Sequence, residues 1–164
     1  MIKGIAAASI TILVSVYALA AGPLTVEHIQ QVIDAVDAAA MKRDTQGIGK
    51  YLSEHFKKTV EVSYQGRTGS MKLDKNQYLD LIDQGWADME QYGYQREDTL
   101  IHIAADGLSG ESSSTITETV VIDGEPRVSK VREYAQYALE NGTAVITSIG
   151  GHTLVGDTMP DVSQ

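Results

Sequence analysis

The sequence predicts an α+β fold in which N-terminal helices cover a bent, mainly antiparallel sheet. Two turn signals support the sheet: Val120-Val121-Ile122 leads into Asp123-Gly124, and Ala138-Leu139-Glu140 leads into Asn141-Gly142. Asp-Gly and Asn-Gly accept the positive φ angles of type I′ turns, so each predicts a two-residue hairpin. The first half instead has apolar residues at helical spacing. A bent sheet closed by helices forms a cone with an open end, a shape suited to holding small molecules.

Three helices are expected before the strand meander. Thr25 can cap the first, Asp44 or Thr45 a shorter second, and Asp74 the third, which opens with a capping-box pattern. A strand is expected from Thr59 to Gln65, where apolar and polar residues alternate. The apolar faces of the helices consist of Ile29, Val32, Ile33, Val36 and Ala40 in the first, Ile48, Tyr51, Leu52 and Phe56 in the second, and Tyr78, Leu81, Ile82, Trp86 and Met89 in the third.

The N-terminus predicts a secretory signal peptide of residues 1–20. Lys3 supplies a positive charge, and Gly4 through Leu24 carry none. Ala18-Leu19-Ala20 fits the small-x-small rule of signal peptidase, with cleavage after Ala20. The alternative is an uncleaved membrane anchor, since about 20 apolar residues can span a bilayer. Gly22-Pro23 favours cleavage, so the protein is expected to be exported, either periplasmic or secreted.

The chain is acidic and has no cysteine. Its 164 residues carry a formal net charge of −9, which becomes −10 once cleavage removes Lys3. An acidic protein repels phosphate backbones and anionic lipids, so no nucleic acid and, after cleavage, no membrane is expected as a partner. Without disulfides or a thiolate, the fold depends on its core. The length allows one domain, residues 21–156, followed by a flexible tail of residues 157–164.

The order of elements resembles that of the NTF2-like superfamily, including its SnoaL-like and ketosteroid isomerase branches. The residues that carry the resemblance are Lys42–Ile48 with Tyr51-Leu52 and Phe56, Thr59–Val62, and the closing strand Gly142–Ile149. The resemblance covers nearly all of the mature chain and implies a cystatin-like cone. The superfamily includes isomerases, dehydratases, epoxide hydrolases and many non-enzymatic domains, so the resemblance implies a fold and no single activity.

The ketosteroid isomerase branch can be compared residue by residue. Counting back from Asp44, the oxyanion-hole tyrosine of that branch falls at Val36, and its general-base aspartate falls at Val62. A valine can neither donate a hydrogen bond to an enolate oxygen nor accept a proton. The comparison therefore argues against isomerase chemistry of this kind.

The two hairpins assign residues to the two faces of the sheet, because a two-residue loop fixes which residues lie opposite each other. The inner face, under the helices, is expected to carry Ile116, Val120, Ile122, Val131, Ala135, Tyr137, Leu139, Ala144 and Ile146. The outer face is expected to carry Ser113, Thr115, Thr117, Thr119, Lys130, Arg132, Tyr134, Gln136 and Thr147, together with Val121, Val128, Val145 and Ile149.

Four polar residues fall in the inner register and form the candidate site: Glu118, Ser129, Glu133 and His152, the last beside Val131. A carboxylate next to a half-buried imidazole can act as a base, or can bind an amine or hydroxyl group. The alternative is that these residues lie at the wet margin of the sheet, and a β-bulge would move some of them to the other face. The same pocket is expected to include Tyr137, Tyr51 and Trp86.

The remaining histidines give no metal signal. His102, within Leu100–Ile103, is expected to be a buried structural residue with a hydrogen-bond partner. His28 and His55 are expected to face solvent. No two histidines have metal-ligand spacing and no phosphate-binding glycine loop follows a strand, so neither a metal nor a cofactor is expected.

Three functions are compatible with these observations. The first is non-catalytic binding of a small, mostly apolar ligand in the cone, and the second is a lyase, isomerase or hydrolase that uses Glu118, Glu133 and His152. The third is an assembly module. In each case a homodimer through the outer sheet face is expected, with Tyr134 and Ile149 near its centre. That face is too polar to be a core and is flat, and its apolar residues need some cover.

Overall fold

A computed structural model describes residues 22–64 and 67–155, which form three helices and six strands in an α+β arrangement. The expected signal peptide (1–20) and tail (157–164) lie outside these residues. Among the described helices, none has the length and apolar character needed to cross a membrane. The elements are α1 (Val26–Met41), α2 (Thr45–Gly49), β1 (Leu52–Tyr64), β2 (Arg67–Asp74), α3 (Lys75–Ala87), β3 (Gln91–Ile103), β4 (Ser109–Ile122), β5 (Glu125–Glu140) and β6 (Thr143–Val155).

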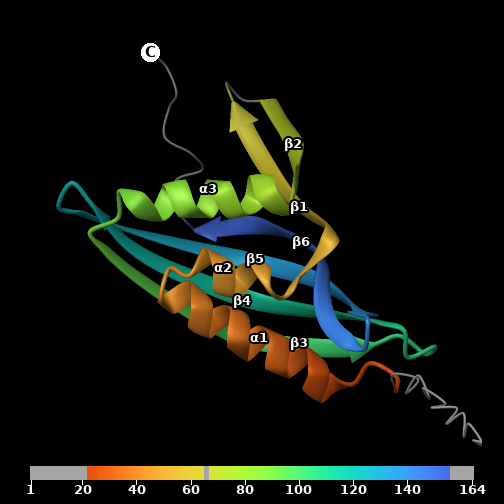
Figure 1. Ribbon diagram of the computed structural model, residues 1–164. Helices are drawn as coiled ribbons and strands as arrows, with labels where there is room; N and C mark the ends of the chain where they lie inside the picture. The colour runs from red at the N-terminus through yellow and green to blue at the C-terminus, as the bar shows by residue number, and fades with distance from the viewer. Residues whose placement is uncertain (1–21, 65–66, 156–164) are drawn as a thin grey trace, which may run out of the picture.

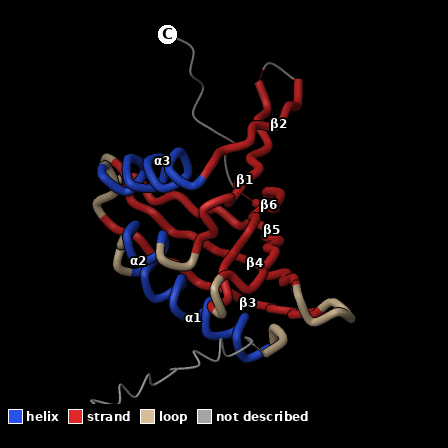
Figure 2. The backbone as a smooth tube through the Cα atoms, turned by 45° about the vertical axis from the view of Figure 1, so that its right-hand side comes forward, coloured by secondary structure: helices blue, strands red, loops and turns tan. Residues whose placement is uncertain are grey.

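The strands form one sheet in the order β2-β1-β6-β5-β4-β3 (Figure 1). Strands β3 to β6 make an antiparallel meander, and β1 with β2 makes an antiparallel hairpin. The hairpin joins the meander through a parallel pairing of β1 with β6, in which Lys58 lies beside Ile149. The helices lie on one face of this mainly antiparallel sheet (Figure 2), as the sequence predicted.

Both predicted hairpin turns are confirmed. The φ angles are 53° and 74° at Asp123 and Gly124, and 52° and 80° at Asn141 and Gly142. Positive φ at both central residues is the requirement of a type I′ turn. Next to these turns the predicted register is also confirmed, as Ile116 lies opposite Val131, Glu118 opposite Ser129, Leu139 opposite Ala144 and Tyr137 opposite Ile146.

The first and third helices begin where the sequence predicts, each with a capping box. The Thr25 hydroxyl accepts a hydrogen bond from the His28 N–H, and the His28 imidazole accepts one from the Thr25 N–H. Asp74 and Gln77 exchange the same pair of bonds at the start of α3. Each box satisfies two backbone N–H groups that the helix leaves unpaired.

The second helix is shorter than predicted. Asp44 caps it, but it contains only Thr45–Gly49, and the chain enters β1 at Leu52. Phe56, expected on this helix, therefore lies on a strand that begins well before the expected Thr59. Two glycines within five residues make a helix entropically costly to extend. Instead the segment pairs with β6, first at Leu52 opposite Ile146 and again at Lys57 and Lys58 after an irregularity.

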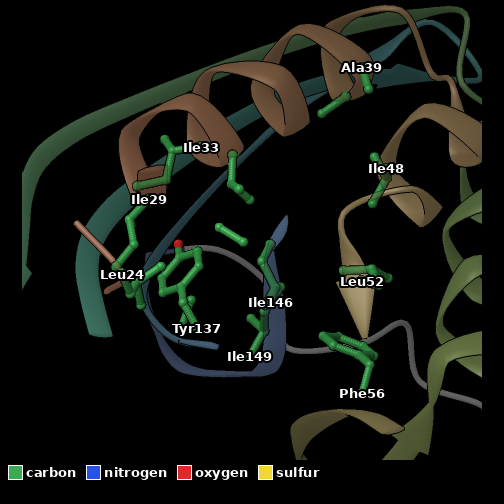
Figure 3. Packing of buried hydrophobic residues seen from close by; sticks show 14 of the residues in the cluster. Leu24, Ile29, Ile33, Ala39, Ile48, Leu52, Phe56, Tyr137, Ile146 and Ile149 are labelled. Atoms are coloured by element: carbon green, nitrogen blue, oxygen red, sulfur yellow. The ribbon is translucent and has the colours of Figure 1, made fainter. Parts of the chain in front are cut away.

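The core lies between the helices and the inner face of the sheet. Figure 3 shows Ile29 and Ile33 of α1 in the same buried cluster as Tyr137 and Ile146 of the sheet. Ile29 and Phe56 are fully buried, with 0% of their surface exposed. Burial of an aliphatic or aromatic side chain of this size contributes about 1.5–3 kcal/mol, so this interface holds the helices on the sheet.

A β-bulge at Thr147 changes the register of β6. On one side of it Ile146 lies opposite Tyr137, and on the other Ser148 lies opposite Gln136, so one residue has no partner. Because side chains alternate between faces, one extra residue exchanges the faces of everything that follows.

The bulge makes two predicted placements wrong. Ile149, expected on the outer face, lies opposite Ala135, is 5% exposed and faces inward. His152, expected on the inner face, lies opposite Arg132 on the outer face, with its ring centroid 6.1 Å from that of Tyr134.

The predicted structural role of His102 is also wrong. His102 is exposed on the outer face of β3, opposite Glu111. Ile101 and Ile103 pack against the core, and strand alternation directs the residue between them to the other face. Leu100, on the same outer face, is 68% exposed, so this run of apolar residues does not form a strand buried on both faces.

Candidate functional site

A cavity of about 400 Å³ lies between the helices and the inner face of the sheet. An apolar cavity of about 150 Å³ holds one benzene ring, so this one has room for a larger molecule. Its apolar lining consists of Ile33, Val36, Ala40, Ile48, Leu81, Ile82, Trp86, Met89, Ile116, Val131, Ala135, Ile146 and Ile149. Its polar lining consists of Lys58, Tyr78, Tyr92, Tyr94, Arg96, Glu118, Glu133 and Tyr137.

Four of the seven candidate residues from the sequence line this cavity: Glu118, Glu133, Tyr137 and Trp86. Ser129 lies opposite Glu118 on β5 but does not reach the lining. Tyr51 is partly buried against the core, and His152 is on the other side of the sheet. The proposed carboxylate and imidazole are therefore separated by the sheet.

Of the two positions compared with ketosteroid isomerase, the structure describes the side chain of only one. Val36 lines the cavity from α1 but offers no hydrogen-bond donor. Val62 lies on β1 opposite Gly69, and its side chain is outside the described part of the chain.

A buried polar network connects α1, β3 and β5 at the wall of the cavity. The Arg96 Nε lies 3.0 Å from both carboxylate oxygens of Asp37, and its Nη1 lies 3.1 Å from Glu133 Oε1. The Tyr94 hydroxyl donates to Asp37 at 2.9 Å and accepts a bond of 2.9 Å from Arg96 Nη2. Burial lowers the pKa of Arg96, but Glu133, Tyr94 and Asp37 outweigh it and raise the pKa overall. Arg96 thus remains a cation that holds the two carboxylates.

A second polar pair lies further along the same face. The Tyr92 hydroxyl donates to Glu118 Oε1 at 2.7 Å, and the Tyr92 ring packs edge-on against Trp86 with centroids 5.7 Å apart. Arg43, at the end of α1, donates to the Met89 carbonyl at 2.7 Å and lies over the Tyr92 ring. These contacts position the aromatic end of α3 against β3.

Lys58 brings an amine to the cavity from β1. Its Nζ lies 5.7 Å from the centroid of the Tyr78 ring, and Tyr78 in turn packs on Phe56 with centroids 5.3 Å apart. Burial lowers the pKa of Lys58, while the carboxylates of Glu133 and Glu118 oppose that shift. Within the described residues, no acceptor lies within hydrogen-bonding or ion-pair distance of this amine.

Burial keeps the cavity tyrosines protonated at neutral pH. It raises the pKa of Tyr137 to about 12 and places the pKa values of Tyr78, Tyr92 and Tyr94 well above their usual range. Nearby carboxylates add to the shifts, because a tyrosinate beside a glutamate would be a second negative charge. The four hydroxyls therefore keep their protons, and each can donate a hydrogen bond. No three or more His, Asp or Glu side chains of the described residues are grouped as metal ligands.

Sequence reasoning missed Lys58, Asp37 and the β3 residues of the site. Lys58 is two residues after Phe56, so in a strand the two side chains face the same side. A prediction that started β1 before Phe56 would have placed Lys58 on the inner face. Asp37 lies four residues after Ile33, on the apolar stripe of its helix. The alternation along β3 places Tyr92, Tyr94 and Arg96 on one face. Which face this is cannot be counted from β4, because the two strands are joined by a longer loop and β3 has a bulge with Asp98 at φ 50°.

Comparison with known proteins gives fold relatives but no sequence relatives. No family model and no curated protein matches the chain. Among solved structures, the hexachlorocyclohexane dehydrochlorinase LinA-type3 from Novosphingobium barchaimii LL02 is similar with a TM-score of 0.64 and 10% identity, over 83% of this chain and 90% of that one. A suggested scytalone dehydratase from Novosphingobium aromaticivorans has a TM-score of 0.65 and 6% identity, over 82% and 87%.

A third similar structure is of an uncharacterized protein with a cystatin-like fold from Caulobacter vibrioides. Its TM-score is 0.61 at 13% identity, over 79% of this chain and 89% of that one. At such identities the likeness concerns the fold alone. Together with the helices on one face of a bent mixed sheet, it shows that the chain has a cystatin-like fold.

Proposed function

We propose that this protein binds a small, mostly apolar ligand that carries one polar group, inside the cavity between its helices and sheet. The observation that carries the proposal is a pair of polar groups beside an apolar wall, the Lys58 amine and the Tyr78 hydroxyl, which have no hydrogen-bond partner among the described residues. No fully buried side-chain nitrogen or oxygen among the described residues lacks a hydrogen-bond partner. These two groups are therefore accessible from the cavity, where a ligand atom can pair with them.

The size and lining of the cavity agree with this role. Small-molecule sites are typically hollows of about 300–1,000 Å³ with mostly apolar walls and a few convergent polar groups. Here the three helices supply seven of the thirteen apolar side chains, and the strands supply every polar one except Tyr78 of α3. A flat ligand of two fused rings, with its polar group directed at Lys58, fits this division.

Non-catalytic binding is favoured over the catalytic alternative that the sequence suggested. That alternative required His152 beside Glu133, and the bulge at Thr147 places His152 on the opposite face. Glu133 is engaged by Arg96 and Glu118 by Tyr92, so neither carboxylate is paired with an imidazole in the cavity.

The single tryptophan provides a direct test. Trp86 lines the cavity and is the only tryptophan in the chain, so its indole N–H gives one signal in an NMR spectrum. Titration with naphthylmethanol, naphthaldehyde, naphthoate and naphthylmethylamine should move this signal for at least one neutral member of the set. If none of the four compounds moves it, the protein does not bind ligands of this class in the cavity.

A matched pair of variants on α3 identifies the site. Gly85 lines the cavity, and no atom lies within 4 Å of where its Cβ would be, so Gly85→Leu adds a side chain to the lining at a position with free space for a Cβ. Ala87 is exposed on the same helix and does not line the cavity. Gly85→Leu should weaken binding, and Ala87→Leu should leave it unchanged.

We also propose that the protein is exported, with cleavage after Ala20, and that it is a homodimer through the outer sheet face. On that face Leu100 is 68% and Tyr134 50% exposed, and both line a hollow of about 520 Å³. A two-fold axis would place Leu100 and Tyr134 of one copy against the same two residues of the other. Ile149, which the sequence placed at the centre of this contact, belongs to the interior, and Leu100 takes that place.

A further inference from the structure

Lys58 occupies an unusual position for a lysine, because it faces the interior of the molecule. It lies beside Ile149 of β6, which lies opposite Ala135 of β5, and both of these residues line the cavity. Glu133 is two residues from Ala135 and so belongs to the next inward-facing row, about 7 Å along the strand. The amine thus lies over the Tyr78 ring, and Glu133 lies in the neighbouring inward-facing row.

The carboxylates near Lys58 are committed to other partners. Glu133 accepts from Arg96 Nη1 at 3.1 Å, and Glu118 accepts from the Tyr92 hydroxyl at 2.7 Å. Neither lies within 4 Å of the Lys58 amine. Burial lowers the pKa of this lysine, which increases the fraction of neutral, nucleophilic amine.

We propose that Lys58 is a nucleophile that forms an imine with the carbonyl group of an aldehyde or ketone ligand in the cavity. This inference rests on the proposed ligand-binding function and names the ligand class. Three features of the site support it together: an amine without an ion-pair partner among the described residues, largely apolar walls, and protonatable groups around it.

The reaction balances without any oxidant or reductant. Lys58 first gives up a proton, which a Glu118 or Glu133 carboxylate can accept. The amine nitrogen then attacks the carbonyl carbon, a C–N bond forms, and the electron pair of the C=O π bond moves to the oxygen. The oxygen takes the proton back from the carboxyl group, and the nitrogen loses its second proton to a carboxylate, which gives a neutral carbinolamine. The C–O bond then breaks, the hydroxyl takes this second proton and leaves as water, and the nitrogen shares its electron pair to form the C=N bond of a protonated imine. Tyr78 faces the same space and can donate a hydrogen bond to the departing oxygen.

The charges around the cavity favour a neutral carbonyl compound over a carboxylate. Glu118 and Glu133 line the cavity and Asp37 lies behind Arg96, so three negative groups face one permanent cation. A carboxylate ligand would add a fourth negative charge, and nearby like charges disfavour one another. An aldehyde or ketone carries no charge into the site.

Reductive trapping tests the proposal. The full chain is incubated with naphthaldehyde and sodium cyanoborohydride, whose hydride reduces an imine to a stable secondary amine, and the labelled residue is located by peptide mass spectrometry. Lys57 is the matched control, because it is the adjacent residue of β1 and is exposed on the opposite face. Lys58 should be labelled several-fold faster than Lys57, and Lys58→Arg should abolish that fast phase while Lys57→Arg should not.

The outcomes separate the two proposals. If naphthaldehyde and the unreactive naphthylmethanol both move the Trp86 indole signal but Lys58 is labelled no faster than Lys57, binding stands and the imine is ruled out. If neither compound moves that signal and labelling is uniform over the lysines, both proposals fail. Excess naphthylmethanol should slow the labelling of Lys58 alone, because it competes for the cavity and does not react with surface amines.

Discussion

The guanidinium of Arg96 on β3 and the carboxylate of Asp37 on α1 meet at 3.0 Å, with Nε equidistant from both carboxylate oxygens. The two side chains are only 10% and 20% exposed. This ion pair fixes the first helix to the sheet beside the cavity. It also holds Arg96 where its Nη1 reaches Glu133, so the same contact that orients the helix orients a cavity carboxylate.

Replacement of Asp37 should therefore destabilise the protein strongly. Removing one partner of a buried ion pair leaves the other charge uncompensated, and Asp37→Asn should cost about 3 kcal/mol in the free energy of unfolding, measured by urea denaturation. Asp34 lies one turn earlier on the exposed side of α1, so Asp34→Asn should change stability by about 0.5 kcal/mol or less. Equal effects of the two substitutions would show that the network does not stabilise the fold.

Replacement of Lys58 should have the opposite effect on stability. Burial lowers the pKa of Lys58 in the folded state, so between that value and the ordinary lysine pKa the unfolded chain binds more protons. The free energy of unfolding then rises with pH through this window, and the cost of burying the charge is fully present below it.

Lys58→Met has no charge to bury. It should melt a few degrees higher than the wild type at neutral pH and below, and the difference should shrink as pH rises through the window. Lys57→Met, on the exposed side of the strand, should show neither effect in the same scanning calorimetry series. A wild-type protein as stable as Lys58→Met at every pH would contradict the burial of this amine.

Two glycine substitutions should differ in sign. Gly85 has free space around its Cβ position and lies within helix α3, so Gly85→Ala should stabilise the protein by about 0.5–1 kcal/mol. At Gly110 a Cβ would lie 2.6 Å from Ile29 Cδ1 and 3.0 Å from the His102 carbonyl oxygen. Gly110→Ala should therefore cost about 1–3 kcal/mol in chemical denaturation. A neutral Gly110→Ala would mean that α1 packs less closely on β4 than described.

The proposed dimer has a simple mass test. Light scattering of the wild type at micromolar concentration should give twice the chain mass, and Tyr134→Asp should halve it, because the charge would be buried without a partner. Met41 is 59% exposed at the end of α1, so Met41→Asp is a control that introduces the same charge on the helical side. A monomeric wild type would refute the dimer and leave the cavity proposals untouched.

The sequence predicts most of the fold because its turns and caps are encoded locally. Asp123-Gly124 and Asn141-Gly142 fix both the turn type and the first pairs of the register, and Thr25 and Asp74 fix two helix starts. Glu118 and Glu133 were placed correctly in the cavity because the register counts directly from those turns.

The errors arise where contacts between distant parts of the chain determine the local structure. The bulge at Thr147 has no glycine or other turn residue to announce it, yet it reverses the faces of Ile149 and His152. The early start of β1 at Leu52 coincides with its pairing to Ile146 of β6, which lies far along the chain. Lys58 was missed for the same reason, since its inward orientation follows from that pairing.

The parallel pairing of β1 with β6 also has a consequence for how the protein is synthesised. The hairpin of β1 and β2 is made early, but its partner β6 is the last strand of the sheet to leave the ribosome. Until then the nascent chain cannot bring Lys58 beside Ile149, and pairings of such long sequence separation form slowly. The cavity is therefore completed only at the end of translation, and a chain that stops short of β6 would lack it however well its earlier elements had folded.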